Sequence, residues 1–230
     1  MNSAKGYFKA HTTKAFRLAI RQLGEEWRTS RLHRRSVKTA RQLLCGSPLK
    51  LNLGCGPNPK PGWVNIDLFD SAADLRLDLR EHWPFPDGAV CHVYGEHVFE
   101  HFQFHEQVPH FLSESLRVLC TGGRFDVGVP DTEWPLRAYG DPNDDYWTFA
   151  KAIHPAWCET QLDHLNYHFS QEKEHGYAWE GEHKYAWDEE TLERSLKKSG
   201  FSGVKRRQFD SSLDSESRRI GTLYICAFKF

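Results

Sequence analysis

The segment LNLGCGPNPKPGWVNID, residues 51–67, decides the fold of this chain. The apolar run Leu49–Leu53 predicts a buried β-strand, and it ends at Gly54-Cys55-Gly56. In nucleotide-binding α/β folds such a strand leads to a third glycine and a helix that receives a phosphate. Here prolines stand at positions 57, 59 and 61, and proline lacks an N–H donor and interrupts a helix. The loop is therefore predicted to be a poor phosphate cradle.

The second half of the same segment carries an acid. Trp63–Ile66 predicts the next strand, and Asp67 follows it directly. A carboxylate in this place can accept hydrogen bonds from both hydroxyls of a ribose, and a bare Gly-x-Gly lets a bulky ligand lie against the backbone. An adenosyl ligand without phosphates satisfies both features.

The rest of the chain alternates between strands and connectors. Further strands are predicted over 74–77, 90–94, 124–129, 204–209 and 222–230, with helices near 106–119 and from Asp188 to Gly200 and a turn at 121–123. Strands alternating with connectors in this way indicate a doubly wound α/β sheet. Residues 131–185 break the pattern with crowded aromatics and histidines, which indicates an insertion.

Composition limits the class of protein. A chain of 230 residues with 39% apolar content suits one α/β domain with an appendage. The six cysteines contain no C-x-x-C pair, which argues against a disulfide framework and a cysteine-ligated zinc. Neither a secretory signal nor a membrane-spanning run is evident, so the expected location is cytoplasmic.

An excess of positive over negative charge is found only in the N-terminal arm, residues 1–47. Residues 1–50 hold twelve Lys/Arg and two Asp/Glu, a net +10, whereas the rest of the chain carries −11. The arm is predicted to form a basic amphipathic helix over 13–29 and a second helix over 36–44. The favoured interpretation is a helix laid over its own core, and the alternatives are peripheral contact with an anionic membrane or a lid over an anionic substrate. The acidic body argues against nucleic acid as a partner.

Four blocks in order resemble the class I S-adenosylmethionine-dependent methyltransferases, and most closely the small methyltransferases associated with polysaccharide biosynthesis. They are LNLGCGPNPKPGWVNID, DLRLDLREHWPFPDG (74–88), EHVFEH (96–101) and LRVLCTGGRFDVGVPD (116–131). The likeness spans 49–131 and, more weakly, 188–230. It implies a Rossmann-like domain over 48–230 with a seven-stranded, mostly parallel sheet, an antiparallel last strand, and residues 132–185 as an acceptor-side insertion.

The resemblance also implies a set of S-adenosylmethionine-binding residues. It places the methionine part against Gly54, Cys55 and Gly56, and the ribose on Asp67. It places the adenine at Asp78 and Leu79, and sets Glu96 and His97 facing the sulfonium. Asn52 and Leu68, which flank the loop and the acid, complete the expected cofactor-binding set.

The expected catalytic residues are His97, Glu100, His101 and Asp131. The first three follow the strand 90–94, where an open α/β sheet exposes ligand-facing groups. An imidazole such as His97 can accept a hydroxyl proton near neutral pH if a carboxylate, Glu100 or Asp131, orients it. His101 could serve catalysis or only brace the loop. The predicted reaction is O-methylation of a saccharide or another small hydroxylated acceptor.

Two alternatives remain open at this stage. Residues 97–101 also fit H-x-x-E-H, the zinc signature of inverted metalloproteases, which requires a long helix around the motif. The chain could instead be a methyltransferase-like binding module without catalysis.

The insertion adds a set of polar residues, His154, Asp163, His164, His168, His175 and His183. Polar packing is favoured over a metal for this set, although dependence on a divalent metal is not readable from sequence. The aromatics of the insertion suit either stacking on a sugar ring or packing onto the sheet.

Overall fold

A six-stranded mixed sheet forms the centre of the protein. We describe it from a computed structural model that covers residues 7, 11–43, 48–171 and 182–230. The strand order is β2 (Val64–Ile66), β1 (Leu49–Leu53), β3 (Val90–Glu96), β4 (Leu119–Pro130), β6 (Thr222–Phe228) and β5 (Ser202–Arg207). The strands β1 to β4 pair in parallel, and β6 runs antiparallel to both of its neighbours. The predicted α/β sheet is thus confirmed, including the antiparallel last strand.

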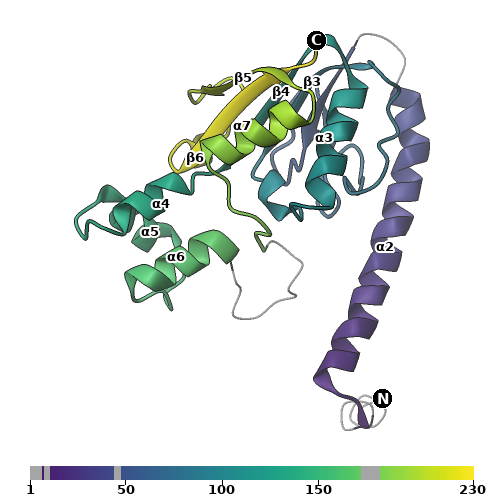
Figure 1. Ribbon diagram of the computed structural model, residues 1–230. Helices are drawn as coiled ribbons and strands as arrows, with labels where there is room; N and C mark the ends of the chain where they lie inside the picture. Colours follow the sequence, from purple (N-terminus) through teal and green to yellow (C-terminus); the bar gives the residue numbers. More distant parts are fainter. Residues whose placement is uncertain (1–6, 8–10, 44–47, 172–181) are drawn as a thin grey trace.

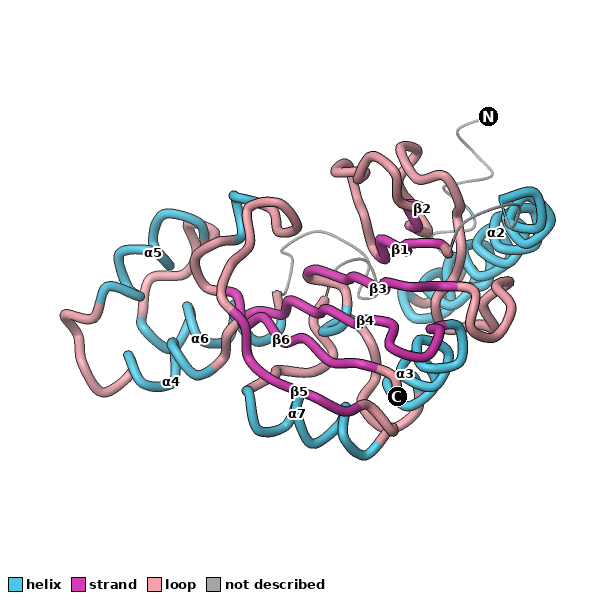
Figure 2. Tube along the Cα trace, turned by 90° about the horizontal axis from the view of Figure 1, so that it is seen from above, coloured by secondary structure: helices cyan, strands magenta, loops and turns pink. Residues whose placement is uncertain are grey.

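Two helices cover one face of this sheet. They are α3 (Gln107–Val118) and α7 (Glu189–Lys198), which lie on the same side in both views (Figures 1 and 2). Side chains of a strand alternate between the two faces, and the buried apolar ones, such as Val93 and Phe125, join Leu192 of α7 in one core cluster. The intervening residues are polar or amphipathic. The opposite face of the sheet is therefore available for a polar network.

The sheet has six strands rather than the predicted seven, because residues 74–77 do not form a strand. Only Leu75 pairs, in a single bridge to Ile66. Beyond it, the N–H groups of Arg76 and Asp78 donate to the Ser36 hydroxyl and to Nδ1 of His33 at 2.8 and 3.2 Å. Both partners lie on helix α2 (Lys14–Leu43). The segment bonds to a helix instead of continuing the sheet edge.

The prediction of two N-terminal helices is wrong, because α2 is one continuous helix of 30 residues. The apolar periodicity fades after Trp27, but the chain there contains neither proline nor a second glycine. Arginine and leucine are good helix formers, so the helix continues through this stretch. The loss of apolar periodicity therefore does not mark the end of the helix.

The outer half of α2 does not lie over the core as the favoured interpretation had it. Phe16, Ile20, Leu23 and Trp27 are exposed, Leu23 to 72%, and the helix projects past the sheet (Figure 1). Only its later part packs on the body, where Thr29 and Ala40 are buried. None of the helices in the described part of the chain combines the length and the apolar character that crossing a bilayer requires.

The insertion after β4 folds into helices of its own. These are α4 (Glu133–Ala138), α5 (Asp145–Ile153) and α6 (Gln161–Ser170), which lie beyond one end of the sheet (Figure 2). They enclose a separate apolar cluster that includes Tyr146, Trp147 and Leu165, with Trp134 and Phe149 packed against it. These aromatics therefore pack within the insertion. His175, Tyr177 and Trp179 lie outside the described residues.

The remaining bounds differ from the predictions in detail. The helices α3 and α7 begin within a residue of the predicted start, and Asp188 caps α7 by accepting from Thr191 N at 2.8 Å. The predicted turn at residues 121–123 lies inside β4, where Gly122 has φ +75°. A left-handed glycine bends the strand there without ending it.

Candidate functional site

Three N–H donors of the loop after β1 already have partners within the protein. Cys55 N donates to Ile66 O at 3.0 Å, Asn58 N to Cys55 O at 3.0 Å, and Gly56 N to Oδ2 of Asp67 at 3.0 Å. Prolines at 57 and 59 have no donor to offer. A phosphate needs several converging N–H groups. The structure therefore agrees with the prediction that this loop does not cradle a phosphate.

The side chain of Asn65 on β2 anchors the same loop through hydrogen bonds. Its Oδ1 accepts from Asn52 Nδ2 at 2.9 Å and from Lys60 N at 2.7 Å, while its Nδ2 donates to Lys60 O at 3.1 Å. The side chain of Asn65 thus takes the place of a helix in closing the short connection between β1 and β2. Asn52, an expected cofactor-binding residue, is buried and serves this anchor.

The two loop glycines play different roles. A Cβ on Gly54 would lie 2.6 Å from Cγ2 of Val98, so the space above Gly54 is filled by a side chain of the protein. A Cβ on Gly56 would meet nothing within 4 Å, and Gly56 has φ +49°. The side of the backbone where a Cβ would lie is therefore open at Gly56 and filled at Gly54.

Asp67 orients the loop and keeps some acceptor capacity. Its Oδ1 accepts from the N–H groups of Phe69 and Asp70 at 2.8 and 2.9 Å, and its Oδ2 from Gly56. Each carboxylate oxygen has two lone pairs, and Asp67 is only partly buried. Oδ2 can accept a further hydrogen bond from a ligand hydroxyl. Leu68 follows it at a partly buried position.

A polar cavity of about 50 Å³ lies in front of the loop, at the carboxyl ends of β1 and β3. Its walls include Gly54, Cys55 and Gly56 on one side and Glu96, Ser215 and Arg218 on the other. Burial, followed by the charges of Asp67 and other nearby acids, raises the pKa of the Cys55 thiol to about 12. Cys55 is therefore a protonated wall residue at neutral pH and not a nucleophile.

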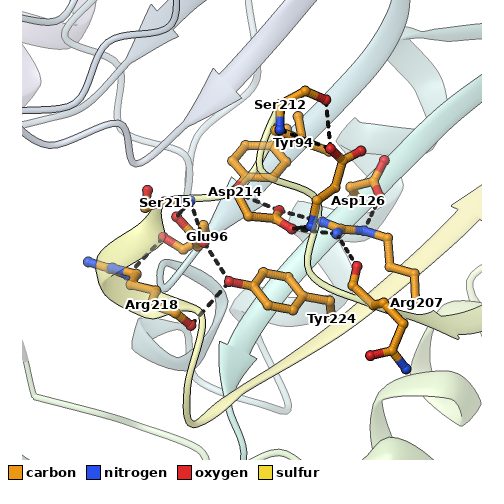
Figure 3. Close-up of polar contacts among 12 residues, drawn as sticks. Tyr94, Glu96, Asp126, Arg207, Ser212, Asp214, Ser215, Arg218 and Tyr224 are labelled. Carbon is orange, nitrogen blue, oxygen red and sulfur yellow. Dashed lines mark hydrogen bonds and ion pairs between the residues drawn. The ribbon is translucent and has the colours of Figure 1, made fainter.

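Glu96 forms the far wall of this cavity (Figure 3). Its Oε1 accepts from Tyr224 OH at 2.9 Å and from Ser215 N at 3.2 Å, and its main-chain carbonyl accepts from Arg218 Nη1 at 3.2 Å. Gly128 allows this arrangement, because a Cβ there would lie 2.8 Å from Cε1 of Tyr224. No ion pair joins Arg218 to a carboxylate in the part of the chain that the structure describes.

A chain of buried ion pairs supports that wall from the polar face of the sheet (Figure 3). Asp126 accepts from Nε of Arg207 at 2.6 Å, and Arg207 donates through both terminal nitrogens to Asp214 at 2.6 Å. Tyr94 OH also donates to Asp214, at 3.2 Å. Asp214 directly precedes Ser215, so the network fixes the segment that meets Glu96.

His97 occupies a strained turn at the carboxyl end of β3. Its φ is +53°, a left-handed value that is uncommon for a residue with a side chain. The N–H of His97 donates to Gly128 O at 2.8 Å, and its Nε2 lies 2.9 Å from the Thr222 hydroxyl. The ring is 20% exposed and its Nδ1 lies 3.6 Å from Oε1 of Glu100.

Of the two predicted orienting acids, the structure brings Glu100 to His97. The Asp131 carboxylate has other partners, since its Oδ1 accepts from Glu133 N at 3.0 Å and its Oδ2 lies 3.6 Å from Nη2 of Arg206. Glu100 is fully buried, and this burial raises the pKa of its carboxyl to about 8. His101 lies on the 3₁₀ helix η1 (Phe99–His101), where its Nε2 is 4.0 Å from Oε1 of Glu100.

The helix that the H-x-x-E-H alternative requires is absent from this segment. Residues 97–101 form a left-handed turn followed by a three-residue 3₁₀ helix, and β3 ends directly before them. The two histidines therefore do not lie one turn apart on an α-helix, as that zinc signature demands.

The predicted adenine residues lie away from the cavity, under α2. The Asp78 carboxylate pairs with Arg80 at 2.7 Å, and Arg80 also contacts Glu26 of α2. Burial raises the pKa of Asp78, but the hydrogen bonds and charge of Arg80 outweigh it and the net pKa lies below its usual value. Leu79 is buried in the main core. Whether an adenine reaches this region stays a prediction.

In the insertion, His164 and His168 both lie on α6, as expected if that segment is helical. Nδ1 of His164 lies 3.0 Å from Nδ1 of His154, and burial lowers the pKa of His154 to about 4. Cys158 lies close enough to these two rings to complete a set of three metal-ligating atoms. The two rings contact each other, and the preference for polar packing over a metal stays a prediction.

The chain is similar to known proteins in its fold. No family model matches the chain, and no curated protein sequence matches it. A solved SAM-dependent methyltransferase from Methanosarcina mazei is 13% identical with a TM-score of 0.51, over 80% of this chain and 93% of that chain.

Two further solved structures are similar over most of both chains. A SAM-dependent methyltransferase from Archaeoglobus fulgidus is 18% identical with a TM-score of 0.46, over 89% of this chain and 94% of its own. One from Thermotoga maritima, described as a possible histamine N-methyltransferase, is 14% identical with a TM-score of 0.46, over 92% and 96%.

The match to the Methanosarcina protein shows that this chain has the α/β Rossmann-like fold of SAM-dependent methyltransferases. The predicted resemblance to class I methyltransferases is thereby confirmed at the level of the fold. The closer likeness to enzymes of polysaccharide biosynthesis stays a prediction.

Several residues of the site were not predicted from the sequence. Tyr224, Ser215 and Arg218 lie more than 110 residues beyond Glu96 in the chain, yet they contact it. Tyr224 lies between the apolar Leu223 and Ile225, and this alternation could have assigned it to the polar face of the last strand. Nothing in the sequence marks Ser215 or Arg218.

Proposed function

We propose that this chain is an S-adenosylmethionine-dependent methyltransferase that acts on a hydroxyl group of a saccharide or another small acceptor. The proposal rests on the polar cavity between the glycine loop and Glu96, which lies in a chain with a methyltransferase fold. S-adenosylmethionine supplies an electrophilic methyl group on its sulfonium. The residues of the chain then have to bind, orient and handle a proton.

The charges of the cavity suit the amino-acid end of that cofactor. Arg218 offers a guanidinium on the side of the cavity where Glu96 offers a carboxylate. A methionine moiety carries one carboxylate, which Arg218 can pair with, and one ammonium, which Glu96 can pair with. Asp67 and the open backbone at Gly56 lie on the route toward a ribose. The cavity of about 50 Å³ holds only part of the cofactor, so the remainder would lie along the partly exposed edge at Asp67.

His97 is the proposed general base. A hydroxyl acceptor loses a proton on methylation, and an imidazole within hydrogen-bond reach can take it. The left-handed turn projects the ring from the end of β3, with Glu100 beside Nδ1 and Thr222 beside Nε2. Glu100 is proposed to orient the ring. His101 and Asp131 remain proposed members of the same site, His101 through Glu100 and Asp131 through the segment that leads into the insertion.

The acceptor is proposed to approach from the insertion, whose first residues follow the end of β4. Several of its aromatics, among them Tyr146 and Trp147, pack into its own cluster, whereas Tyr139 is 50% exposed. Exposed aromatic faces with polar tips suit a sugar ring.

The exposed apolar stripe of α2 supports a separate proposal about partners. Phe16, Ile20, Leu23 and Trp27 share one side of a helix that also carries Arg17, Arg21 and Arg28. Such a helix can lie in the interface of an anionic membrane. We therefore retain peripheral membrane contact as part of the proposal.

Calorimetric binding of S-adenosylmethionine and S-adenosylhomocysteine tests the proposed function. The wild-type chain should bind both, and Asp67→Asn should weaken binding by about 10- to 100-fold, since a hydrogen bond to a charged group contributes about 1.5–3 kcal/mol. Asp70→Asn is the matched control, because Asp70 lies on the same loop without contacting Gly56. Failure of the wild-type chain to bind either compound would refute the proposal.

A further inference from the structure

Two segments bring three side chains together in a cluster that the proposed reaction does not fully use. Glu100 and His101 come from η1, and His183 comes from the segment that leads into α7. The N–H groups of Lys184 and Tyr185 donate to Glu100 O at 2.7 and 3.2 Å. The main chain thus fixes His183 next to Glu100.

Among the residues that the structure describes, no group donates a hydrogen bond to the carboxylate at the centre of the cluster. The Glu100 side chain is 2% exposed, and neither of its oxygens has a hydrogen-bond partner within the described residues. A buried carboxylate without a partner is costly, and proteins satisfy such a group with a proton, a donor or a cation. Oε1 points to Nε2 of His183 at 3.9 Å and Nε2 of His101 at 4.0 Å, which is too far for a hydrogen bond.

Both imidazole rings present a lone pair to this carboxylate. Nδ1 of His101 lies 3.1 Å from Glu182 O, and Nδ1 of His183 lies 3.2 Å from His168 O. A carbonyl oxygen can only accept, so Nδ1 carries the proton in each ring and Nε2 of the neutral ring carries a lone pair. This arrangement is the one that fixes the tautomer of metal-binding histidines.

The geometry points to a divalent transition-metal site made by Glu100, His101 and His183. The ligating atoms lie within 4.8 Å of one another. Around Zn²⁺, ligands at about 2.0–2.2 Å in tetrahedral geometry would be about 3.4 Å apart. The side chains therefore have to draw together, by about half an ångström for the pairs at 3.9 and 4.0 Å and by up to about 1.4 Å for a pair at the 4.8 Å limit. Two imidazoles and one carboxylate suit Zn²⁺ rather than Mg²⁺ or Ca²⁺, which prefer oxygen ligands.

Three protein ligands leave one position of a tetrahedral site for an external ligand. The side chain of His101 is 35% exposed, so this position can be reached from solvent. If the chain is a methyltransferase as proposed above, the ion lies beside His97, whose Nδ1 is 3.6 Å from Glu100. A hydroxyl of the acceptor is then the external ligand that fits the position.

Zinc binding to the purified full chain tests the site without any activity assay. The protein is stripped with a chelator, the chelator is removed, and Zn²⁺ is titrated calorimetrically, with Co²⁺ absorption as a second readout of tetrahedral geometry. The wild type should bind one equivalent at this site. Glu100→Gln and His183→Ala should each weaken that binding by at least about 100-fold, since even second-shell changes cost 10- to 100-fold.

Two control variants locate the site. His105→Ala removes an exposed histidine outside the cluster, and His154→Ala disables the other set of potential ligands, His154, Cys158 and His164. Both should keep the wild-type affinity. Absence of saturable binding to the wild type, or a loss in His154→Ala with none in His183→Ala, would overturn the inference. Circular dichroism shows whether the variants fold.

S-adenosylmethionine binding, measured on the same variants, separates this inference from the proposed function. Glu100 and His183 do not line the cofactor cavity, so Glu100→Gln and His183→Ala should bind the cofactor as the wild type does. A chain that binds zinc through this cluster but not the cofactor would retain the metal site and refute only the methyltransferase proposal.

Discussion

Replacement of Asp126 by asparagine would test the ion-pair network that supports the polar cavity. Asp126 is completely buried on β4 and accepts from Nε2 of His92 at 2.7 Å, Nη2 of Arg124 at 2.8 Å and Nε of Arg207 at 2.6 Å. Asparagine keeps the volume but removes the charge. Removing one member of a buried ion pair typically costs 3–5 kcal/mol. Because Arg207 would keep Asp214 as a partner, we expect a loss near the lower end, about 3 kcal/mol of unfolding free energy.

Urea unfolding of Asp126→Asn measures this loss, and Asp87→Asn provides the matched control. Asp87 pairs with Arg117 at 2.8 Å, a similar distance, but its side chain is 81% exposed. An exposed pair contributes about 0–1 kcal/mol because water screens it. Equal losses in the two variants would refute the argument that burial, and not the contact itself, makes the Asp126 network important.

The stability of Asp126→Asn relative to the wild type should also depend on pH, with a defined sign. Burial by itself raises the pKa of Asp126, but the hydrogen bonds from His92 and Arg124 and the charge of Arg207 hold it below its ordinary value of 3.8. A carboxyl with a depressed folded-state pKa stabilises the fold above its unfolded pKa, and this contribution is lost as the pH falls through the folded value. The difference in stability between the wild type and Asp126→Asn should therefore shrink below about pH 4.

Two further predictions concern activity and the N-terminal arm. His97→Ala should lower kcat of methyl transfer by about 10²- to 10⁴-fold, the range for losing a general base, with cofactor affinity nearly unchanged. His105→Ala is the control, and an active His97→Ala enzyme would remove His97 from that role. The double variant Leu23→Ser/Trp27→Ser should cosediment less than the wild type with phosphatidylserine vesicles, whereas phosphatidylcholine vesicles should bind neither the wild type nor the variant well. Equal sedimentation of the wild type and the variant with the anionic vesicles would exclude a membrane role for the helix.

Several parts of the fold could be predicted because their signals are local. The strand Leu49–Leu53 is found with the predicted bounds, and Asp188 begins α7 as a side-chain cap. Hydrophobic alternation and capping residues act within a few positions of the chain. The failed strand at residues 74–77 shows the opposite case, since its partners Ser36 and His33 lie about forty residues away on α2.

In the candidate site, too, some residues could be proposed from sequence and some contacts could not. The glycine loop, Asp67 and residues 96–101 could be proposed from sequence, because a strand that ends in glycine or in an acid marks the carboxyl edge of a parallel sheet. The pairing of Glu96 with Tyr224 and Ser215 could not, nor could the choice of Glu100 over Asp131 as the neighbour of His97. Those contacts join segments that are brought together only when the sheet closes.

By itself, the sequence determined the α/β class, the proline-blocked glycine loop and the residues that can carry acid–base chemistry, because patterning and backbone chemistry are properties of neighbouring residues. Only the tertiary structure decided which carboxylate faces which imidazole, which glycine stays open to a ligand, and that His183 meets Glu100. The sequence separation of Glu100 and His183 exceeds eighty residues, and their contact depends on the hydrogen bonds that Lys184 and Tyr185 make to the Glu100 carbonyl.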